Sequence, residues 1–572
     1  MRKTTNLTLC VFLASTLVGT ASAQKPAAVD QNSADAAQQA EHHTSPSASA
    51  ATVDHEIDAI IKREHEEIAT IRRYSPIIET YIQDTTADKK KGVVPVHDHY
   101  FLGQAELSKG IVDDPMVNRK RKEHDAINPI SHLSGMFTTS YVPEGFLQMV
   151  FIDRSGFDRQ HYKFRYVGEE PLGDVRCLIF NVEPLPKSGN GRFRGRIWVE
   201  DQDYSIVRFT GVYFPIVGAN GFNLHFDSWR WNVQPGLWLP AYVFSRESDL
   251  NVPRGHHVRF RSQTRLWGYS LKDAGRLEEF SELTIESPDA VQDQTVRDRS
   301  PIEAQRAWRQ QAEKNVLEGL QRTGLLAPQG ETDKALEKVV NNLVEANDLS
   351  FDPELHCRVM LTDTLEMFAV GHTIVLSRGL LDVLPDEPSL ATMLAQELAD
   401  IMVTQATLDQ WGFNDATRVT VAEAMIRFSF KDTPEQIRLA SQKALELLKN
   451  SPYKDKLASA GLFLKQLDLD SKALPALVNP HLGNRVYLAA QLMALAPKPD
   501  ATNLEQIPAL PIGSRVHLDP WNDQVEWMSG EHGPLLWVGE QVPFEITPYM
   551  PHLTRYGSTN APKPAANSDT SN

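Results

Sequence analysis

Side chains able to act on a substrate or to hold a metal ion gather in one stretch of the second half of the chain. Glu397 and Asp400 lie three residues apart in a segment whose leucines recur at helical spacing, and His372 precedes them. Because histidine and carboxylates are suitable metal ligands, one hypothesis is a metal site built from these three side chains. The chain has no HExxH or HxxEH zinc motif and no Gly-x-Ser-x-Gly nucleophile elbow.

The composition excludes two broad classes of protein. Of the 572 residues, 41% are hydrophobic and 23% are charged, so the chain can bury a sizeable core and is not globally disordered. There are 74 acidic residues against 58 lysines and arginines, which gives a formal net charge of −16. Because nucleic acids and anionic membrane surfaces attract basic proteins, we expect no nucleic-acid partner and no polybasic membrane anchor.

The first 23 residues have the pattern of a secretory signal peptide. Arg2 and Lys3 precede an apolar run from 7 to 19, and Ala21-Ser22-Ala23 forms a small-residue cleavage site. We therefore expect a periplasmic or secreted protein; the alternative is an uncleaved anchor helix. No later stretch reaches the ~18 consecutive apolar residues of a transmembrane helix, so we expect none in the mature chain. Residues 24–50 are expected to be a disordered lead-in.

Two cysteines remain once the signal peptide is cleaved. Cys177 and Cys357 are far apart in sequence, which says nothing about their distance in space. An oxidising compartment permits one disulfide between them. Two separate buried thiols are the alternative, and the sequence leaves both open.

Hydrophobic periodicity separates an N-terminal helix from a long region of strands. Between residues 51 and 90, isoleucines recur at helical spacing with charges between them, which predicts an amphipathic helix. From 91 to 290 the pattern changes to period two, and residues 192–199 place arginines on one face and apolar side chains on the other. The expected structure is an antiparallel sheet with one buried face. Its arginine-bearing face either receives phosphate or carboxylate groups or is simply hydrated.

The sheet is expected to be curved. In residues 222–226 the apolar side chains hold the even positions, but Trp229 and Trp231 lie on the other face, as a β-bulge or a strongly curved strand requires. The order of hairpins, with residues 236–240 (GLWLP) opening a late strand, is similar to the half-barrel of LolA-type periplasmic lipoprotein carriers. This resemblance implies a concave surface that holds a lipid or lipoprotein; the alternative is a generic antiparallel sheet with a filled interior.

Helix-capping signals predict a mainly helical second half. Ser300-Pro301-Ile302-Glu303 has the pattern of an N-cap, a first-turn proline and a capping-box glutamate, in a connecting helix within 291–330 that should end near Arg322.

A further region, 331–500, follows this connecting helix. Residues 501–572 contain many prolines and are expected to form a C-terminal arm with a disordered tail. The predicted fold class is α+β.

The region 331–500 resembles the HtpX/BepA-like zinc metallopeptidases. The resemblance depends on four segments in the family's order: a strand with a Gly-Leu-Leu turn, the helix that bears HExxH, a second helix and a closing segment. They correspond to residues 368–381, 396–400, 433–448 and 479–486. The resemblance implies a gluzincin-like peptidase fold, in which histidines four apart bind zinc and the glutamate between them activates the bound water.

The residues at the family's metal positions indicate that peptidase chemistry has been lost. Gln396 and Asp400 stand where the family has its two zinc-binding histidines, and Leu439 stands at the third ligand. Loss of two or three ligands should empty the site. Without zinc the retained general base, Glu397, has no acidified water to deprotonate, so we expect a silent glutamate and no metal or other cofactor.

Three hypotheses for function follow. The first is an exported pseudopeptidase that binds polypeptide or lipoprotein clients in the cell envelope, because main-chain pairing to an edge strand survives loss of the metal. The resemblance places that peptide-binding cleft strand at Phe368, Gly371 and His372. One alternative is an active zinc metalloendopeptidase with altered ligands. The other is a lipid or lipoprotein carrier whose second half is a scaffold.

Overall fold

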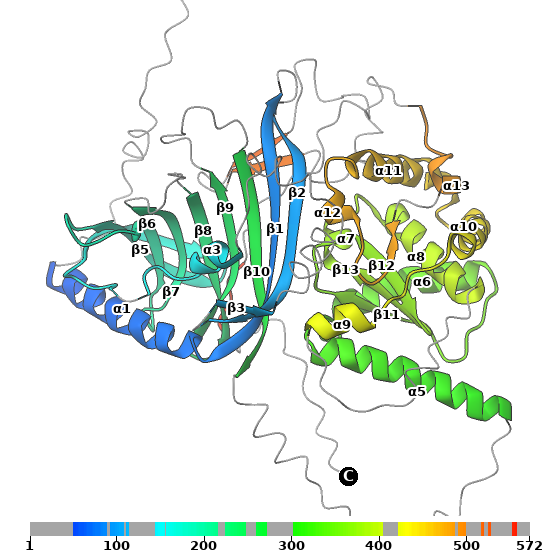
Figure 1. Cartoon of the computed structure of the whole chain (residues 1–572), viewed down its shortest axis with the longest axis horizontal. Helices are drawn as coiled ribbons and strands as arrows, with labels where there is room; N and C mark the ends of the chain where they lie inside the picture. The colour runs from blue at the N-terminus through cyan, green and yellow to red at the C-terminus, as the bar shows by residue number, and fades with distance from the viewer. Residues whose placement is uncertain are drawn as a thin grey trace, which may run out of the picture. The chain divides into compact units, whose positions relative to one another are not determined.

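The strands between Tyr74 and Leu271 form one large antiparallel sheet, as the period-two pattern predicts (Figure 1). The computed structural model describes residues 50–88, 92–107, 110–113, 143–154, 156–214, 224–247, 259–271, 301–403, 421–486, 490–498, 516–519, 524–527 and 552–556. The strands are β1 (Tyr74–Asp88), β2 (Gly92–Glu106), β3 (Gly110–Asp113), β4 (Tyr162–Leu172), β5 (Val175–Pro184), β6 (Arg192–Glu200), β7 (Ile206–Phe214), β8 (Leu224–Gln234), β9 (Leu237–Glu247) and β10 (Arg259–Leu271).

These strands lie in the order β3-β2-β1-β10-β9-β8-β7-β6-β5-β4. β1 therefore lies between β2 and β10, which brings the start of the sheet next to its last strand. The outer strands β3 and β4 do not pair with each other within the described residues, so the described sheet is open. The fold combines this antiparallel sheet with helices, which confirms the predicted α+β class.

Helix α1 (Ala50–Ile71) lies along one face of the sheet, with α3 (Pro143–Gln148) on the same side (Figure 1). Four isoleucines of α1 are buried there in one cluster with strand side chains: Ile57, Ile60, Ile68 and Ile71. The prediction of a helix from 51 to 90 is wrong beyond Ile71, because β1 begins at Tyr74. Pro76 has no N–H to continue a helix, and the residues after it pair with β2 and β10 instead.

The large sheet is buried on both faces over its central strands, which corrects the expectation of one buried face. Phe226 packs in the cluster on the α1 side, whereas Trp229 packs in the cluster that includes the second half of the chain. The predicted change of face at Trp229 therefore reflects a strand covered on both sides. A register shift against β9 follows directly, between Trp229 and Arg230.

The second half contains helices around a small mixed sheet (Figure 1). The helices are α5 (Pro301–Arg322), α6 (Glu331–Ala346), α7 (Arg378–Val383), α8 (Glu387–Val403), α9 (Val421–Arg427), α10 (Pro434–Lys449), α11 (Leu457–Asp470), α12 (Pro475–Val478) and α13 (Ala490–Met493). The strands, in the order β11-β13-β12-β14, are β11 (His356–Met360), β13 (Thr373–Ser377), β12 (Glu366–Val370) and β14 (Asn484–Arg485). Two further strands, β15 (Val516–Asp519) and β16 (Gln524–Trp527), form a hairpin that pairs with neither of these sheets within the described residues. The helix expected to end near Arg322 does so, and Thr433 and Gln436 form the predicted capping box of α10.

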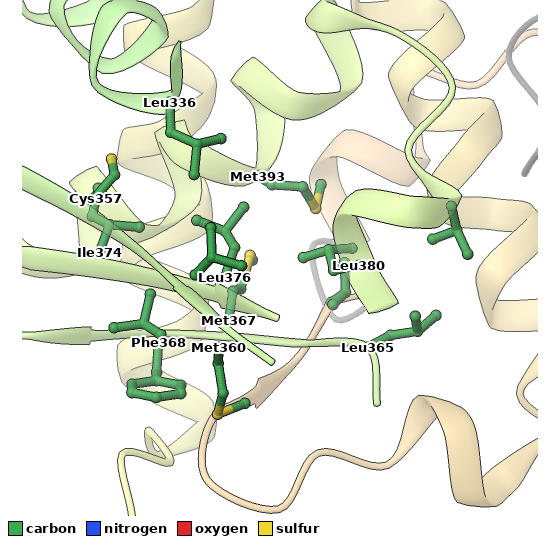
Figure 2. Close-up of a cluster of buried hydrophobic side chains, with 14 of the residues drawn as sticks. Leu336, Cys357, Met360, Leu365, Met367, Phe368, Ile374, Leu376, Leu380 and Met393 are labelled. Carbon is green, nitrogen blue, oxygen red and sulfur yellow. The ribbon is translucent and has the colours of Figure 1, made fainter. Parts of the chain in front are cut away.

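The core of the second half lies between the small sheet and two helices. Figure 2 shows Leu336 of α6 and Met393 of α8 on the same side of the small sheet as Leu376 of β13. Phe368 of β12 points to the opposite side (Figure 2). Both faces of this sheet are therefore covered by apolar side chains.

Buried polar residues join the large sheet to the second half. Arg265 of β10 pairs with Glu79 of β1 (Nη2–Oε2, 2.6 Å) and with Asp363, which precedes β12 (Nη2–Oδ1, 2.9 Å). On β2, Asp98 accepts hydrogen bonds from the backbone N–H groups of Ala476 and Leu477 in α12, both at 2.8 Å. A buried carboxylate thus caps a short helix across the junction.

The described part of the predicted C-terminal arm, residues 552–556, lies on the large sheet. Leu553 is buried, and its carbonyl oxygen accepts a hydrogen bond from the backbone N–H of Asp174 (2.8 Å). Arg555 pairs with Asp201 (Nη2–Oδ1, 2.9 Å). The predicted signal peptide, the lead-in and the tail lie outside the described residues.

The two cysteines are both buried and free, Cys177 on β5 and Cys357 on β11. Burial is the main cause that raises the pKa of Cys177 to about 12, so this thiol is protonated at neutral pH. Among the helices that the structure describes, none is long and apolar enough to span a membrane.

Candidate functional site

Three of the four residues at the predicted lost metal site lie together on α8. Gln396, Glu397 and Asp400 are each more than nine-tenths buried, and Glu397 is 1% exposed. Leu439 lies on α10, which packs against α8, but its side chain is 37% exposed. The structure thus brings the α8 residues into the interior and leaves Leu439 near the surface.

The carboxyl group of Glu397 is in an environment that disfavours its charged form. Burial, together with the nearby carboxylates of Asp400 and Asp432, raises the pKa of Glu397 well above its ordinary value. Its Oε2 atom has no hydrogen-bond partner among the described residues. Asp432 in turn accepts a hydrogen bond from Nδ2 of Asn484 (2.5 Å), within the closing segment of the family resemblance. This environment therefore disfavours the ionised carboxylate that a general base requires.

The hypothetical metal set of His372, Glu397 and Asp400 is not assembled. His372 lies in the turn between β12 and β13, where its Nδ1 is 3.9 Å from Oε2 of Glu313 on α5. Its backbone N–H also donates to Oε1 of that carboxylate (3.1 Å). Over the part of the chain that the structure describes, no group of three or more His, Cys, Asp or Glu side chains is placed to hold a metal ion.

The strand predicted to border a peptide cleft is β12, and part of its edge is occupied by the chain itself. β14 pairs with the first residues of β12. Phe368 is buried and stacks on Phe430, with ring centroids 4.6 Å apart. Gly371 turns β12 into β13 with φ +60°, so residues 368–381 form a hairpin followed by α7 rather than one strand-like run. Peptide binding by these residues stays a prediction.

A second candidate site lies where two neighbouring strands of the large sheet separate. Within the described strands, β9 and β10 pair only where Tyr242–Arg246 face Arg261–Arg265. Both strands continue beyond that ladder, β9 back to Leu237 and β10 on to Leu271. The two segments beyond the ladder form a fork in the sheet.

An apolar pocket of about 350 Å³ lies in this fork. Trp231 and Val233 of β8 are its most exposed apolar side chains, at 45% and 38%. The other lining residues are Tyr74, Gln234, Leu237, Leu239, Pro240, Ala241, Leu266, Trp267, Gly268 and Tyr269. None of the lining residues that the structure describes carries a charged side chain, so the pocket is suited to an apolar group.

Local sequence features favour separation of the strands at this point. Pro240 has no N–H and cannot donate a ladder hydrogen bond. The hydroxyl of Tyr269 donates to the carbonyl oxygen of Pro240 across the fork. On β10, Gly268 has φ +60°, a backbone conformation that residues with a Cβ rarely adopt. These residues shape the fork without regular pairing.

The pocket wall is held from two sides. Arg63 of α1 donates from Nε to Oγ of Ser205 (2.9 Å), and its guanidinium also donates to the carbonyl oxygen of Gly236 in the β8–β9 turn. Asn232 donates from Nδ2 to the carbonyl oxygens of Gln234 (2.8 Å) and Leu237 (3.1 Å). The wall is therefore positioned before any ligand binds.

Sequence reasoning did not identify this pocket, although two signals were present. The change of face near Trp231 and the proline in the GLWLP segment both mark an irregular strand. Neither indicates that β10 separates from β9, because that depends on how two segments distant in sequence pair.

Comparisons with known proteins identify no family for this chain. No protein-family model and no curated protein matches it. Among solved structures, it is similar to one described as an outer membrane lipoprotein-sorting protein domain from Vibrio parahaemolyticus, with 9% identity and a TM-score of 0.19, covering 38% of this chain and 94% of that one. It is also similar to a DUF1329 family protein from Desulfovibrio piger ATCC 29098, with 10% identity and a TM-score of 0.19, covering 39% and 94%. Both TM-scores are below 0.5, so neither similarity carries an argument about function.

Proposed function

We propose that this protein binds an apolar ligand, the acyl chain of a lipid or of a lipid-modified protein, in the pocket between β9 and β10. The observation that carries the proposal is the uncharged, largely aromatic and aliphatic lining of that pocket. Its volume of about 350 Å³ falls within the range of ~300–1,000 Å³ typical of small-molecule sites. This favours the carrier hypothesis over peptide binding.

Removal of apolar surface from water would supply the binding energy. Each buried methylene contributes about 0.8 kcal/mol, and this term needs no polar partner. Trp231 and Val233 are 45% and 38% exposed, which leaves apolar surface for a ligand to cover.

In this proposal the second half acts without catalysis. Burial disfavours the charged form of Glu397, and the three family metal positions carry glutamine, aspartate and leucine. The second half would serve as a scaffold that packs against the sheet through the junction at Arg265 and Asp98. We place the protein in the cell envelope on the basis of the signal-peptide pattern. Polypeptide clients and an active zinc peptidase stay alternatives, and no contact among the described residues supports either of them.

Fluorescence titration with dansyl-undecanoic acid tests the proposal, together with mass spectrometry of lipids extracted from the purified protein. Val233→Glu places a charge in the pocket lining. The matched control is Val167→Glu on β4, because Val167 is 43% exposed against 38% for Val233 and does not line the pocket. We expect Val233→Glu to weaken binding by at least about tenfold, since a carboxylate next to an acyl chain loses its hydration.

The control variant should bind as the native protein does. If the native protein does not bind the fatty acid, or if both valine variants weaken binding equally, the pocket is not the ligand site.

A further inference from the structure

Residues 552–556, the described part of the C-terminal arm, contact three successive hairpin turns of the large sheet. We name this segment the strap. In order along the strap, Leu553 contacts Asp174 in the β4–β5 turn, Arg555 contacts Glu200 and Asp201 at the β6–β7 turn, and Tyr556 contacts Asn232 next to the β8–β9 turn. Because neighbouring strands here are antiparallel, the three turns lie at the same end of the sheet. The strap thus joins the ends of strands β4 to β9.

Two different kinds of contact hold the strap in place. Leu553 is buried, and its carbonyl oxygen accepts a hydrogen bond from the backbone N–H of Asp174 (2.8 Å). Arg555 donates from Nε to Oε1 of Glu200 (2.9 Å) and pairs with Asp201 (Nη2–Oδ1, 2.9 Å). Glu200 is almost fully buried, and attraction between opposite charges is stronger where water is excluded. The apolar anchor and the charged anchor can therefore be removed separately.

Asn232 connects the strap directly to the wall of the pocket between β9 and β10, which we call the acyl pocket. Its Oδ1 accepts a hydrogen bond from the backbone N–H of Tyr556 (2.6 Å). Its Nδ2 donates to the carbonyl oxygens of Gln234 (2.8 Å) and Leu237 (3.1 Å), and both of these residues line the pocket. Since a side-chain amide has one oxygen and one NH2 group, the bond from the strap directs the NH2 group towards the wall.

A second connection to the same wall runs through the β6–β7 turn. Glu200, whose Oε1 contacts the strap, accepts at Oε2 from the backbone N–H of Asp203 (2.7 Å). Oδ1 of Asp203 accepts in turn from the backbone N–H of Ser205 (2.9 Å). Arg63 of α1 donates to Oγ of Ser205 (2.9 Å) and to the carbonyl oxygen of Gly236. Both connections therefore end at the β8–β9 turn.

We propose that the strap regulates ligand binding in the acyl pocket. The attached strap holds the β8–β9 turn in the position that binds ligand, and detachment loosens the wall and releases the ligand. This inference rests on the acyl-binding function proposed above. A wall that is ordered before binding loses less conformational entropy when the ligand arrives, so attachment favours binding. A short segment with few contacts of its own can open locally without unfolding of the sheet.

The coupling must act in both directions. If attachment of the strap raises the affinity for a ligand, the ligand raises the stability of the attached strap by the same factor. Hydrogen–deuterium exchange of the full mature chain measures this in the native protein. We expect saturating dansyl-undecanoic acid to slow exchange of the peptide that contains Leu553 and Tyr556 by about fivefold or more, the low end of typical couplings between sites. Unchanged exchange of that peptide would overturn the proposal.

Two variants weaken the strap in different ways. Arg555→Gln removes the charged anchor, and Leu553→Ala removes the apolar one; neither residue lines the pocket. We expect each variant to release dansyl-undecanoic acid about fivefold faster or more in stopped-flow fluorescence, because couplings of this kind act mainly on dissociation. The matched control is Arg176→Gln. Arg176 also pairs with Asp201 (Nε–Oδ2, 3.3 Å), but within the described residues it has no ion pair or hydrogen bond with the strap.

The control variant should release the probe at the native rate. If the native protein binds the probe and both strap variants release it at the native rate, regulation by the strap fails and acyl binding stands. Regulation by the strap also fails if Arg176→Gln accelerates release as much as the strap variants do, because the effect would then come from the charge of the β6–β7 turn. If the native protein binds no dansyl-undecanoic acid, acyl binding fails, and regulation by the strap fails with it.

Discussion

Arg230 of β8 and Glu64 of α1 form a bidentate ion pair in the protein interior, with two N–O distances of 2.7 Å and both side chains fully buried. Glu67, three residues further along α1, joins the pair through Nη1 of Arg230 (2.9 Å). Burial raises the pKa of Glu67 to about 7, against the opposing effect of Arg230. Helix α1 is thus joined to the sheet by charges as well as by isoleucines.

We expect Arg230→Ala to lower the free energy of unfolding by about 3–5 kcal/mol, because it removes the buried guanidinium that pairs with the buried carboxylates of Glu64 and Glu67. Urea denaturation followed by circular dichroism measures the loss. The control is Arg159→Ala, which breaks pairs with Asp54 and Asp58 on the exposed side of the same helix and should cost less than about 1 kcal/mol. Equal losses in the two variants would contradict the special role of the buried pair.

Glu397→Gln should make the protein more stable at high pH. The pKa of Glu397 in the folded protein lies above the ordinary value of 4.5, so between the two values the folded state binds the extra proton. The stability that the protonated Glu397 carboxyl group contributes is therefore fully present below about pH 4.5. That contribution is lost as the pH rises through the folded pKa of Glu397. Glutamine cannot ionise, so the variant should match the native protein at low pH and exceed it in stability once the pH rises through the folded pKa of Glu397.

Thermal unfolding across this pH range measures the difference. Glu435→Gln is the control, because Glu435 is exposed and its hydrogen bonds with Arg438 lower its pKa. It should give no gain at high pH. If the Glu397→Gln variant and the native protein have the same stability at every pH, Glu397 is already ionised or hydrated in the folded protein.

Zinc content tests the interpretation of the α8 region as a lost metal site. Gln396 and Asp400 lie four apart on α8, so histidines there would share one helix face. We expect zinc near zero in the native chain by elemental mass spectrometry, and a gain in the triple variant Gln396→His, Asp400→His, Leu439→Glu. About one tightly bound zinc per native chain would refute the loss of metal, and no gain in the triple variant would count against the family alignment.

Gly371→Ala should destabilise the protein by about 1–3 kcal/mol, the usual cost of a non-glycine residue held in a sparsely populated backbone region. Gly371 has φ +60°, and a Cβ atom there would collide with the carboxylate of Glu313. That carboxylate accepts hydrogen bonds from the backbone of His372 and from Oγ1 of Thr373, so it has little room to move.

Gly145→Ala is the matched control. Gly145 lies in helix α3, and a Cβ atom there would meet nothing within 4 Å. Chemical denaturation should show no loss, or a small gain, for this variant. A Gly371→Ala protein as stable as the native one would mean that the hairpin turn adapts.

Features that depend on short-range interactions could be predicted from the sequence. The capping box of α10 joins Thr433 to Gln436, three residues away, and the helix forms as expected. The period-two pattern predicted the antiparallel strands for the same reason, because alternation is a property of the strand itself. Where pairing with distant strands decided the outcome, as in the segment after Pro76, the helix prediction was wrong.

The candidate sites were decided by contacts between residues distant in sequence. The sequence by itself determined that a glutamate, an aspartate and an asparagine occupy positions 397, 400 and 232, and that the first two lie three residues apart in a helical segment. Only the tertiary structure decided that Glu397 is buried beside Asp400 and Asp432, that the strap reaches Asn232, and that β9 separates from β10 around an apolar pocket. Burial, proximity of like charges and a gap in a sheet all depend on how segments distant in sequence pack together. A local sequence pattern therefore does not predict them.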